Sequence, residues 1–433
     1  MSDRRELMSE RRPPARPATG PVLIVGFVGV TLAAIGEFQP DDSVIYIEEP
    51  DVVRKRHVRE QLDGAPFVRG LIEWEYHLAG RADEFHNAHP GLAPVAVVPA
   101  IEYATPFAAR LAERYGLPGA GLGAAQILRD KALLRQVSAA AGIANPASVR
   151  VNGPSEVREF LRGQAGPVVL KPANRQAAVG TRVIHDPAEV ERAWADCLVQ
   201  DEGIFVPDRP IELSMLAEQY VAGPEFSVEM LVSEGRPLFV NVTGKQLFPG
   251  PHPVEMAHIV PADIPEETAR SLGAQTARVV AATGFRDGIV HCEWIVADGV
   301  PHLVECAGRL AGGGIVDAIE RAYPVGLMRS YYAVLKGERP AGLPRRAKGA
   351  AAVRFLAAGP GRITAVHGVE EARRADGVFL VAVTAEPGDR FTGLRHSWDR
   401  AGIVMATADS SAEALRRAEA AAATVRIDIE EEA

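Results

Sequence analysis

Two glutamates on a predicted β-hairpin, Glu293 and Glu305, are the residues of this chain that most clearly suggest chemistry. The segments that carry them, 291–296 and 302–306, are rich in β-branched and aromatic residues and flank an Asp-Gly pair, which is typical of antiparallel strands joined by a tight turn. A three-residue loop or a bulge sets Glu293 opposite Glu305 on one face of the sheet. A regular two-residue loop sends them to opposite faces.

A shared face would make the two glutamates a site for a cation. Buried carboxylates placed side by side repel each other and lose hydration, so they need a positive partner. Oxygen ligands without a neighbouring His–Cys cluster favour Mg²⁺ or Mn²⁺ over zinc. Arg309 follows Glu305 closely and adds a guanidinium suited to a phosphate or a carboxylate. The alternative, a polar sheet edge with solvated glutamates, explains the hairpin equally well when the hairpin is taken alone.

The composition limits the classes of protein to which this chain can belong. Its 433 residues allow roughly two to four domains, and a content of 47% hydrophobic and 24% charged residues argues against wholesale disorder. A net charge of −9 argues against a nucleic-acid-binding protein but not against ATP, whose charge magnesium largely neutralises. Three cysteines without disulfide or metal spacing predict a reducing, cytoplasmic environment, and we expect Cys292 and Cys306 in the core.

The N-terminus imitates a signal peptide or a membrane span only loosely. Two arginines precede an apolar run over residues 21–35, which is shorter than the roughly 20 residues of a spanning helix. Glycines interrupt the run, so it predicts a buried strand that enters a helix through a glycine turn. Residues 1–20, rich in Arg and Pro, predict a mobile tail, and we expect no association with a membrane.

Residues 21–125 predict an N-terminal α/β domain. Short apolar runs at residues 22–25, 43–47 and 95–98 predict buried strands, and residues 107–115 predict a helix. Strands that alternate with helices indicate parallel βαβ units in a small doubly wound domain.

Residues 126–340 predict a second domain, and residues 341–433 a C-terminal α+β lobe that packs on it. A helix is expected from residue 129 to residue 141, a compact closing lobe at about residues 149–221, and antiparallel strands at 226–231, 238–243 and in the hairpin. After a basic linker, strands are expected at 352–356 and 378–383 and a helix at 411–421.

Four elements besides the hairpin suggest a nucleotide site. Lys171 ends the apolar strand 168–172, where a lysine either reaches solvent or meets an anion. Lys131 begins its predicted helix, where the helix dipole disfavours a cation. The loop 174–181 follows the strand, as phosphate-binding loops do, and the segment 218–229 carries three glutamates.

Together these elements resemble the ATP-grasp superfamily. The resemblance rests on Lys131, the VVLKPA strand, the EQYVAGPEFSVE segment, Lys245 and the ending in which Arg309 follows Glu305, and it spans roughly residues 20–430. It implies an ATP-grasp fold, α/β and α+β in class, preceded by a Rossmann-like domain and followed by a C-terminal lobe. Within the superfamily the chain resembles amino-acid ligases of the alanine–anticapsin ligase and carnosine synthase type.

The resemblance assigns the nucleotide and the metal to particular residues. Lys131 and Lys171 would hold the α- and β-phosphates of ATP, and Lys245 would approach the γ-phosphate. Glu293 and Glu305 would bind Mg²⁺ or Mn²⁺. The remaining nucleotide contacts would come from the backbone of Gln219 and Val221 with Glu218 at adenine, and from Glu225 at the ribose.

The substrate pocket is assigned in the same way. Arg309 would steady the transferred phosphoryl group or the acyl phosphate. His258, with Glu255 as a weaker companion, would line the substrate pocket, or else be a hydrogen-bonded core histidine. His291 shares a face with Glu293 and would either orient it or merely pack. Gly313 has no side chain, which suggests room for a bulky substrate beside it.

Two positions depart from the family pattern. The phosphate loop usually carries several glycines, whereas here none precedes Gly180, so a stiffer loop is expected, with Arg175 supplying charge. Many members place an asparagine two residues after the second glutamate as a further metal ligand, and this chain has Ala307 there. Metal coordination should therefore depend on the glutamates and water.

The function implied is ATP-dependent ligation of a carboxylate, such as an amino acid, to an amine through an acyl phosphate, with release of ADP and phosphate. A homodimer is expected by analogy. One alternative is carboxylation with bicarbonate, suggested by the C-terminal lobe, although the chain has no Met-Lys-Met biotinylation site. Another is a nucleotide-binding regulator with impaired chemistry, suggested by the glycine-poor loop.

Overall fold

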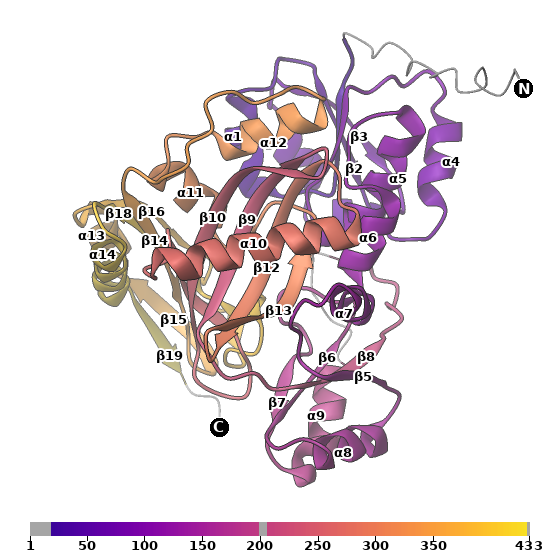
Figure 1. Ribbon diagram of the computed structural model, residues 1–433. Coiled ribbons are helices and arrows are strands. Elements are labelled where there is room, and N and C mark those ends of the chain that lie inside the picture. Colours follow the sequence, from indigo (N-terminus) through magenta and orange to yellow (C-terminus); the bar gives the residue numbers. More distant parts are fainter. Residues whose placement is uncertain (1–18, 199–205, 431–433) are drawn as a thin grey trace, which may run out of the picture.

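The computed structural model describes residues 19–198 and 206–430 (Figure 1). Nearly all of the predicted tail over residues 1–20 lies outside these ranges. The apolar run 21–35 consists of a buried strand, a 3-10 turn and a short helix, as predicted. Within the described residues, no helix combines the length and the apolar composition needed to cross a membrane.

The N-terminal part is built on a parallel sheet with strand order β3-β2-β1-β4. Its strands are β1 (Val22–Val25), β2 (Val44–Glu48), β3 (Val68–Glu73) and β4 (Ala96–Pro99). One face packs on α4 (Arg81–Ala88) and α5 (Thr105–Tyr115), and the other on α1 (Leu32–Gly36), α2 (Pro50–Lys55) and α3 (Val58–Leu62). The strands β1, β2 and β4 are predicted correctly. The edge strand β3 escaped prediction because it is only half-buried and has no continuous apolar run.

A small antiparallel lobe projects at the bottom of Figure 1. Its sheet has the order β5-β8-β6-β7, with β5 (Ser148–Val151), β6 (Val168–Pro172), β7 (Arg182–Ile184) and β8 (Met215–Gln219). The helices α8 (Pro154–Arg162) and α9 (Val190–Cys197) pack on one face of it. This lobe corresponds to the predicted closing lobe.

An eight-stranded sheet of order β13-β12-β9-β10-β11-β14-β18-β16 forms the centre of the molecule. Its strands are β9 (Glu225–Ser233), β10 (Arg236–Leu247), β11 (Glu255–Val260), β12 (Gly288–Ala297), β13 (Val300–Ala307), β14 (Ala350–Leu356), β16 (Val378–Val383) and β18 (Gly402–Ala408). The predicted boundary after residue 340 falls between α12 (Leu327–Leu335) and β14, and the sheet continues across it.

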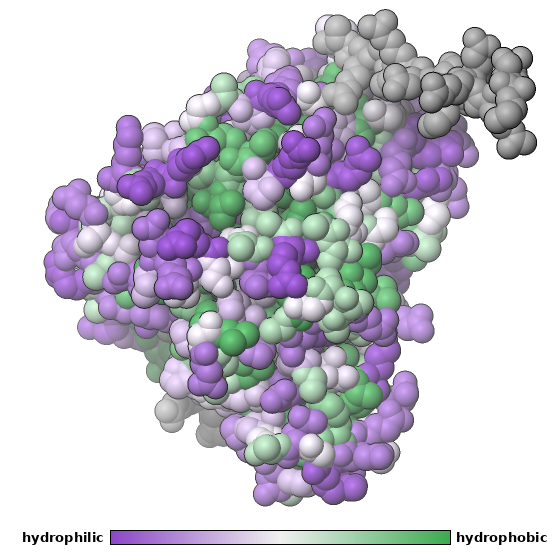
Figure 2. Space-filling view, in the orientation of Figure 1, coloured by the Kyte–Doolittle hydropathy of each residue, from purple (hydrophilic) through white to green (hydrophobic). Residues whose placement is uncertain are grey.

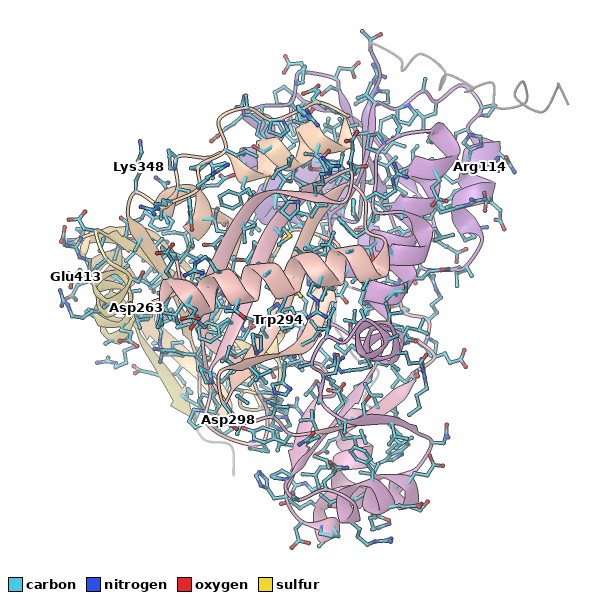
Figure 3. The ribbon with its side chains drawn as sticks, in the orientation of Figure 1. Arg114, Asp263, Trp294, Asp298, Lys348 and Glu413 are labelled. Carbon is cyan, nitrogen blue, oxygen red and sulfur yellow. The ribbon has the colours of Figure 1, made fainter. Side chains whose placement is uncertain are left out.

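Helices enclose both faces of this sheet. The long helix α10 (Glu266–Thr283) lies across one face, where Trp294 is buried beneath it and donates from its ring N–H to the hydroxyl of Thr276 (Figure 3). The other helices of this part are α6 (Leu122–Arg129), α7 (Lys131–Ala140), α11 (Ile315–Ala322) and α12 (Leu327–Leu335). The predicted helix from residue 129 begins at Lys131 instead, because Asp130 is extended and caps α7 by accepting the N–H groups of Ala132 and Leu133.

The C-terminal part completes the molecule with a second, three-stranded sheet of order β17-β15-β19. Its elements are β15 (Gly361–His367), α13 (Val369–Arg374), β17 (Arg390–Phe391), α14 (Ser411–Thr424) and β19 (Arg426–Glu430). The helix α14 packs on β14 and β18 through buried alanines. Hydrophilic residues dominate the rim of the face shown in Figure 2, with smaller apolar patches nearer its middle.

The hairpin of β12 and β13 has the register that a shared face requires. Its turn is a two-residue loop, with Asp298 and Gly299 both at positive φ, so the regular ladder would separate the glutamates. A bulge at Val304 intervenes: Trp294 pairs with Leu303, but Glu293 pairs with Glu305. Of the two predicted routes to a shared face, the structure uses the bulge.

Candidate active site

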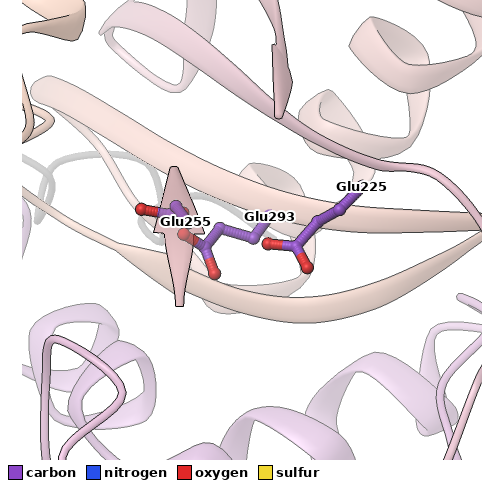
Figure 4. A group of neighbouring side chains, drawn as sticks. All are labelled: Glu225, Glu255 and Glu293. Atoms are coloured by element: carbon purple, nitrogen blue, oxygen red, sulfur yellow. The ribbon is translucent and has the colours of Figure 1, made fainter. Parts of the chain in front are cut away.

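Lys245 lies at the centre of three carboxylates on four neighbouring strands. Its ammonium contacts Glu225 at 3.2 Å and Glu293 at 2.5 Å, and it also pairs with Glu255. The order β12-β9-β10-β11 brings these residues together at one end of the sheet, and Figure 4 shows Glu293 between Glu255 and Glu225. The lysine side chain is fully buried. The sequence singled out all four residues but gave no sign that they form one cluster.

The cluster carries more negative than positive charge. Burial raises the pKa of Glu225, and the nearby Glu293 and Glu255 add to the effect, so that the pKa reaches about 7. Burial opposes the charge of Lys245, but the three carboxylates outweigh it and raise the pKa of the ammonium well above its usual value. Lys245, Arg400 and His291 supply three positive charges against the four carboxylates of Glu225, Glu229, Glu255 and Glu293, so the cluster favours a further cation.

The carboxylate oxygens differ in how they are occupied. Glu293 accepts from Lys245 and from His291 on the same oxygen, Oε1, and Glu225 accepts from Lys245 on Oε1. Within the described residues, Oε2 of each has no hydrogen-bond donor. Glu255 is saturated: Oε1 contacts Lys245, and Oε2 contacts His258 at 3.3 Å and Arg400 at 3.2 Å. The oxygens without a donor belong to Glu293 and Glu225, and together with Glu255 these carboxylates each offer one oxygen within 4.8 Å of the others, as a metal site requires.

Glu305 belongs to a second ionic group on the lobe side of the hairpin. Lys131, at the first position of α7, contacts Glu305 Oε2 at 2.9 Å and donates to the carbonyl of Arg175 at 2.7 Å. Burial raises the pKa of Glu305, but Lys131 outweighs this effect and the pKa falls to about 2. Glu305 is thus ionised and keeps Oε1 without a donor from the described residues. Glu305 thus resembles Glu293, because in each carboxylate one oxygen is engaged and the other has no donor. This arrangement suits a hard divalent cation bound between the paired strands.

A third ionic group lies directly behind Lys131. Lys171, at the end of β6, contacts Glu218 at 2.6 Å, and Arg135 donates to the same carboxylate at 2.8 Å. All three side chains are buried, and burial, which opposes the charge, lowers the pKa of Lys171. The side chain of Glu218, predicted to meet adenine, is engaged in these ion pairs, and the N–H of Gln219 donates to Ala147. Two cationic side chains converging on one carboxylate leave excess positive charge beside the phosphate loop.

Arg309 reaches the N-terminal part of the chain. It contacts Glu102 at 3.1 Å and donates to its neighbour's carbonyl at Leu310. Glu102 also pairs with Arg129 at 2.5 Å, and Arg129 donates to the carbonyl of Asn174 at the start of the phosphate loop. Arg309 is therefore held between the hairpin and the end of β4, on the side where the loop begins.

The phosphate loop adopts a backbone that glycines usually provide. Ala177 and Ala178 both have φ of 58°, and Gly180 has φ of 71°. The left-handed conformation costs roughly 1–2 kcal/mol for a non-glycine residue, so the loop is strained. Arg175, predicted to supply charge, is instead buried. Its backbone carbonyl accepts a hydrogen bond from the ammonium of Lys131.

The space beside Gly313 corrects one expectation. A Cβ built there would lie 2.7 Å from Cε1 of His258 and 3.2 Å from the ring of Phe355, and the residue has φ of 61°. The histidine and the phenylalanine fill the space in which a bulky substrate was expected. His258 is 1% exposed, with Nε2 3.3 Å from Glu255 and Nδ1 3.0 Å from the carbonyl oxygen of Gly313, which fits the hydrogen-bonded core histidine that was the alternative to a pocket residue.

His291 bridges two carboxylates. Nδ1 is 2.9 Å from Glu229 and Nε2 is 3.2 Å from Glu293. Burial opposes the charge of the ring, but the hydrogen bonds to both carboxylates outweigh it and raise the pKa to about 9. Of the two interpretations of His291, its contact with Glu293 fits the orienting one.

Two buried residues of the site were missed at the sequence level. Arg135 lies one helical turn after Lys131 on the same face of α7, and this spacing was a usable signal. Glu102 follows β4 at the carboxyl end of a parallel strand, which is where such sheets place functional residues.

Two family models match parts of this chain. Residues 164–317 match the model of the ATP-grasp domain, and residues 354–430 match L-amino acid ligase C-terminal domain 2. The chain therefore contains an ATP-grasp domain and an L-amino acid ligase C-terminal domain. Both matches confirm the resemblance found in the sequence.

Named relatives of this ATP-grasp chain are ligases and synthases. Dapdiamide A synthase of Enterobacter agglomerans is 26% identical over 66% of this chain and 68% of its own length. Alanine–anticapsin ligase of Bacillus subtilis is 25% identical over 54% of this chain and 52% of its own length. The chain spans about half to two thirds of the length of these curated relatives.

A solved structure supports the fold. The L-amino acid ligase of Bacillus licheniformis superposes with a TM-score of 0.78 at 19% identity, covering 95% of this chain and 99% of the other. The expected ATP-grasp architecture, including the preceding parallel α/β unit, is therefore confirmed.

Proposed function

We propose that this protein is an ATP-dependent carboxylate–amine ligase that joins an amino acid to an amine and releases ADP and phosphate. The observation that carries the proposal is the set of three buried lysines, Lys131, Lys171 and Lys245, each held against glutamates on converging elements. Each buried ammonium already has a carboxylate partner, and the phosphate oxygens of ATP are anions that these lysines can contact in its place.

The roles follow the family pattern. Lys131 and Lys171 hold the α- and β-phosphates, and Lys245 leaves its glutamates to meet the γ-phosphate. The backbone of Gln219 and Val221 contacts adenine, and Glu225 either contacts the ribose or, with its uncommitted oxygen, supports the metal. Glu293 and Glu305 would hold Mg²⁺ or Mn²⁺, which would supply charge neutralisation at the phosphate oxygens.

The chemistry has two steps. The substrate carboxylate attacks the γ-phosphorus, an O–P bond forms, and the bond to ADP breaks. A neutral amine then attacks the acyl carbon of the acyl phosphate, and phosphate leaves as the amide forms. Arg309, held beside the loop by Glu102, steadies the transferred phosphoryl group. His258 and Glu255 line the substrate pocket.

The decisive experiment measures ADP release from ATP and Mg²⁺ against pairs of amino acids and amines, with product masses recorded. We expect ADP formation that requires both substrates and a product whose mass equals that of their condensation. Glu305→Gln should lower the rate at least about 100-fold, because the remaining charges no longer bind the metal correctly. Glu419→Gln, an exposed change on α14, is the matched control.

Absence of ADP with every mixture would contradict the proposal. Dependence on bicarbonate instead of an amine would favour carboxylation, which the match to an L-amino acid ligase C-terminal domain disfavours. Tight ATP binding without any turnover would favour a regulator.

A further inference from the structure

Glu293 is held from behind by a chain of buried polar side chains. His291 Nε2 lies 3.2 Å from Glu293 Oε1, and His291 Nδ1 lies 2.9 Å from Glu229 Oε1. His291 and Glu229 face each other across β12 and β9, in direct register. The histidine therefore connects two carboxylates, of which only Glu293 opens toward the candidate metal position.

Glu229 is the fixed end of this chain. It is 1% exposed, and both of its oxygens are occupied. Oε1 accepts from the hydroxyl of Ser227 at 2.7 Å as well as from His291, and Oε2 accepts from Asn241 at 2.8 Å and Thr243 at 2.7 Å. A carboxylate with both oxygens satisfied by donors from β9, β10 and β12 cannot itself bind a metal ion, but it fixes the imidazole ring.

The contact selects one oxygen of Glu293. His291 and Lys245 both engage Oε1, and no described residue donates to Oε2. When Lys245 moves to a phosphate, the histidine alone still holds Oε1. A ligand held in this way loses less side-chain entropy on binding metal and keeps its angle.

We propose that His291, anchored by Glu229, is a positioning residue that presents Oε2 of Glu293 to the divalent metal. This inference rests on the proposed function, because it takes Glu293 as a metal ligand. It gives a role to two buried residues, Glu229 in the EFSVE segment and His291 in the HCE segment, to which the proposed phosphate contacts give none.

The test measures binding of Mn²⁺ in the presence of ADP, by the electron paramagnetic resonance signal of free Mn²⁺, in the full chain. An asparagine side chain at position 291 is too short to contact both carboxylates. We therefore expect His291→Asn to weaken Mn²⁺ binding about 10-fold or more. Glu229→Gln should weaken binding in the same direction, but less. Ser227→Ala removes one donor to Glu229 without touching His291 and should stay within about twofold of the wild type. Melting temperatures of all variants separate loss of metal from loss of fold.

Glu293→Gln distinguishes the two proposals. If Glu293→Gln loses Mn²⁺ while His291→Asn and Glu229→Gln bind it as the wild type does, the positioning role is wrong and the metal assignment stands. If Glu293→Gln also binds normally, the metal assignment fails and the inference fails with it. Should His291→Asn not fold, Glu229→Gln decides: unchanged affinity overturns the proposal.

Discussion

At the scale of single residues, the buried charges of the site form groups in which positive and negative charges do not cancel. Lys245 faces three glutamates, whereas Lys171 and Arg135 share one. The first group has spare negative charge and suits a metal ion, and the second has spare positive charge and suits phosphate. Each imbalance is disfavoured in the nucleotide-free protein, because burial makes unpaired charge costly. Removal of one of these charges should therefore change the free energy of unfolding and the affinity for metal or ATP in opposite directions.

Removal of the Glu225 charge should stabilise the protein at high pH. The folded carboxyl has a pKa of about 7, above its ordinary value of 4.5, so the unfolded chain releases this proton at lower pH. Its contribution to stability therefore falls as the pH rises from about 4.5 to 7. Glu225→Gln should raise the free energy of unfolding by roughly 1–3 kcal/mol at pH 8 and by little at pH 5. Urea unfolding at both pH values checks this, with Glu419→Gln as control; an equal effect at both pH values would contradict it.

Removal of the Glu218 charge should have the opposite effect. Burial raises the pKa of this carboxyl, but Arg135 and Lys171 outweigh it and hold the pKa below its usual value. The stability it contributes is present above the ordinary carboxyl pKa and is lost as the pH falls through the lowered one. Glu218→Gln should cost about 3 kcal/mol at pH 7, because two buried cations lose their counter-charge. Thermal and urea unfolding measure it. A variant that keeps full stability but binds ATP more weakly would show that Glu218 is a nucleotide contact instead.

At the scale of elements, two irregularities place the functional groups. The bulge at Val304 turns Glu305 to the face of Glu293, which the two-residue turn alone would not do. The phosphate loop reaches its path with alanines at positive φ where glycines are usual. Two of its carbonyl groups contact segments outside the lobe: the carbonyl oxygen of Thr181 lies 3.2 Å from Nδ1 of His252, between β10 and β11, and the carbonyl of Ala177 accepts from the N–H of Ser397 in the C-terminal part. The strained backbone is therefore supported from outside the lobe.

Glycine in the phosphate loop should relieve this strain. Ala177→Gly and Ala178→Gly each remove the Cβ that disfavours positive φ, and after the greater flexibility of the unfolded chain is subtracted we expect a gain of about 0.5–1 kcal/mol. Differential scanning calorimetry measures it. Ala195→Gly, at an exposed position of α9, is the matched control and should lose about 1 kcal/mol. Equal losses at all three positions would show that the loop is not strained.

At the scale of the whole molecule, the small lobe is fastened to the N-terminal α/β unit. Arg209 contacts the buried Glu49 at 2.7 Å, and Asp208 contacts Arg54 at 2.8 Å and Lys55 at 2.9 Å. The residues that follow contact the start of the phosphate loop, because the side chain of Asn174 donates to the carbonyl of Glu212 at 2.7 Å. The ion pairs between residues 208–209 and the N-terminal unit thus set the position of the lobe over the site.

Weakening the ion pairs between residues 208–209 and the N-terminal unit should uncouple ADP release from amide formation. Arg209→Ala leaves Glu49 without its charge partner, so the lobe should close less completely and water should reach the acyl phosphate. We expect more ADP per amide formed, by about two- to tenfold, and weaker ATP binding. ADP and product are measured in the same samples. Arg59→Ala, which removes an ion pair with Glu73 in the same unit, is the control. An unchanged ratio of ADP to product in Arg209→Ala would mean that the segment does not govern closure.

The amino-acid sequence by itself determined which residues can do chemistry and in what order they follow one another. Lys131, Lys171, Glu293 and Glu305 were recognisable because strand ends, helix starts and an Asp-Gly turn are local features with short-range causes. The buried parallel strands were predictable for the same reason, since apolar runs between turns leave few alternatives.

Only the tertiary structure decided how these residues are grouped. Glu225, Glu255 and Lys245 meet because β9, β10 and β11 are neighbours, and strand order depends on packing across the whole sheet. The bulge at Val304, the ring of His258 beside Gly313, and the link from Glu102 to Arg309 follow from contacts between distant segments. Such contacts are set by long-range packing and burial, which leave no periodic trace in the chain.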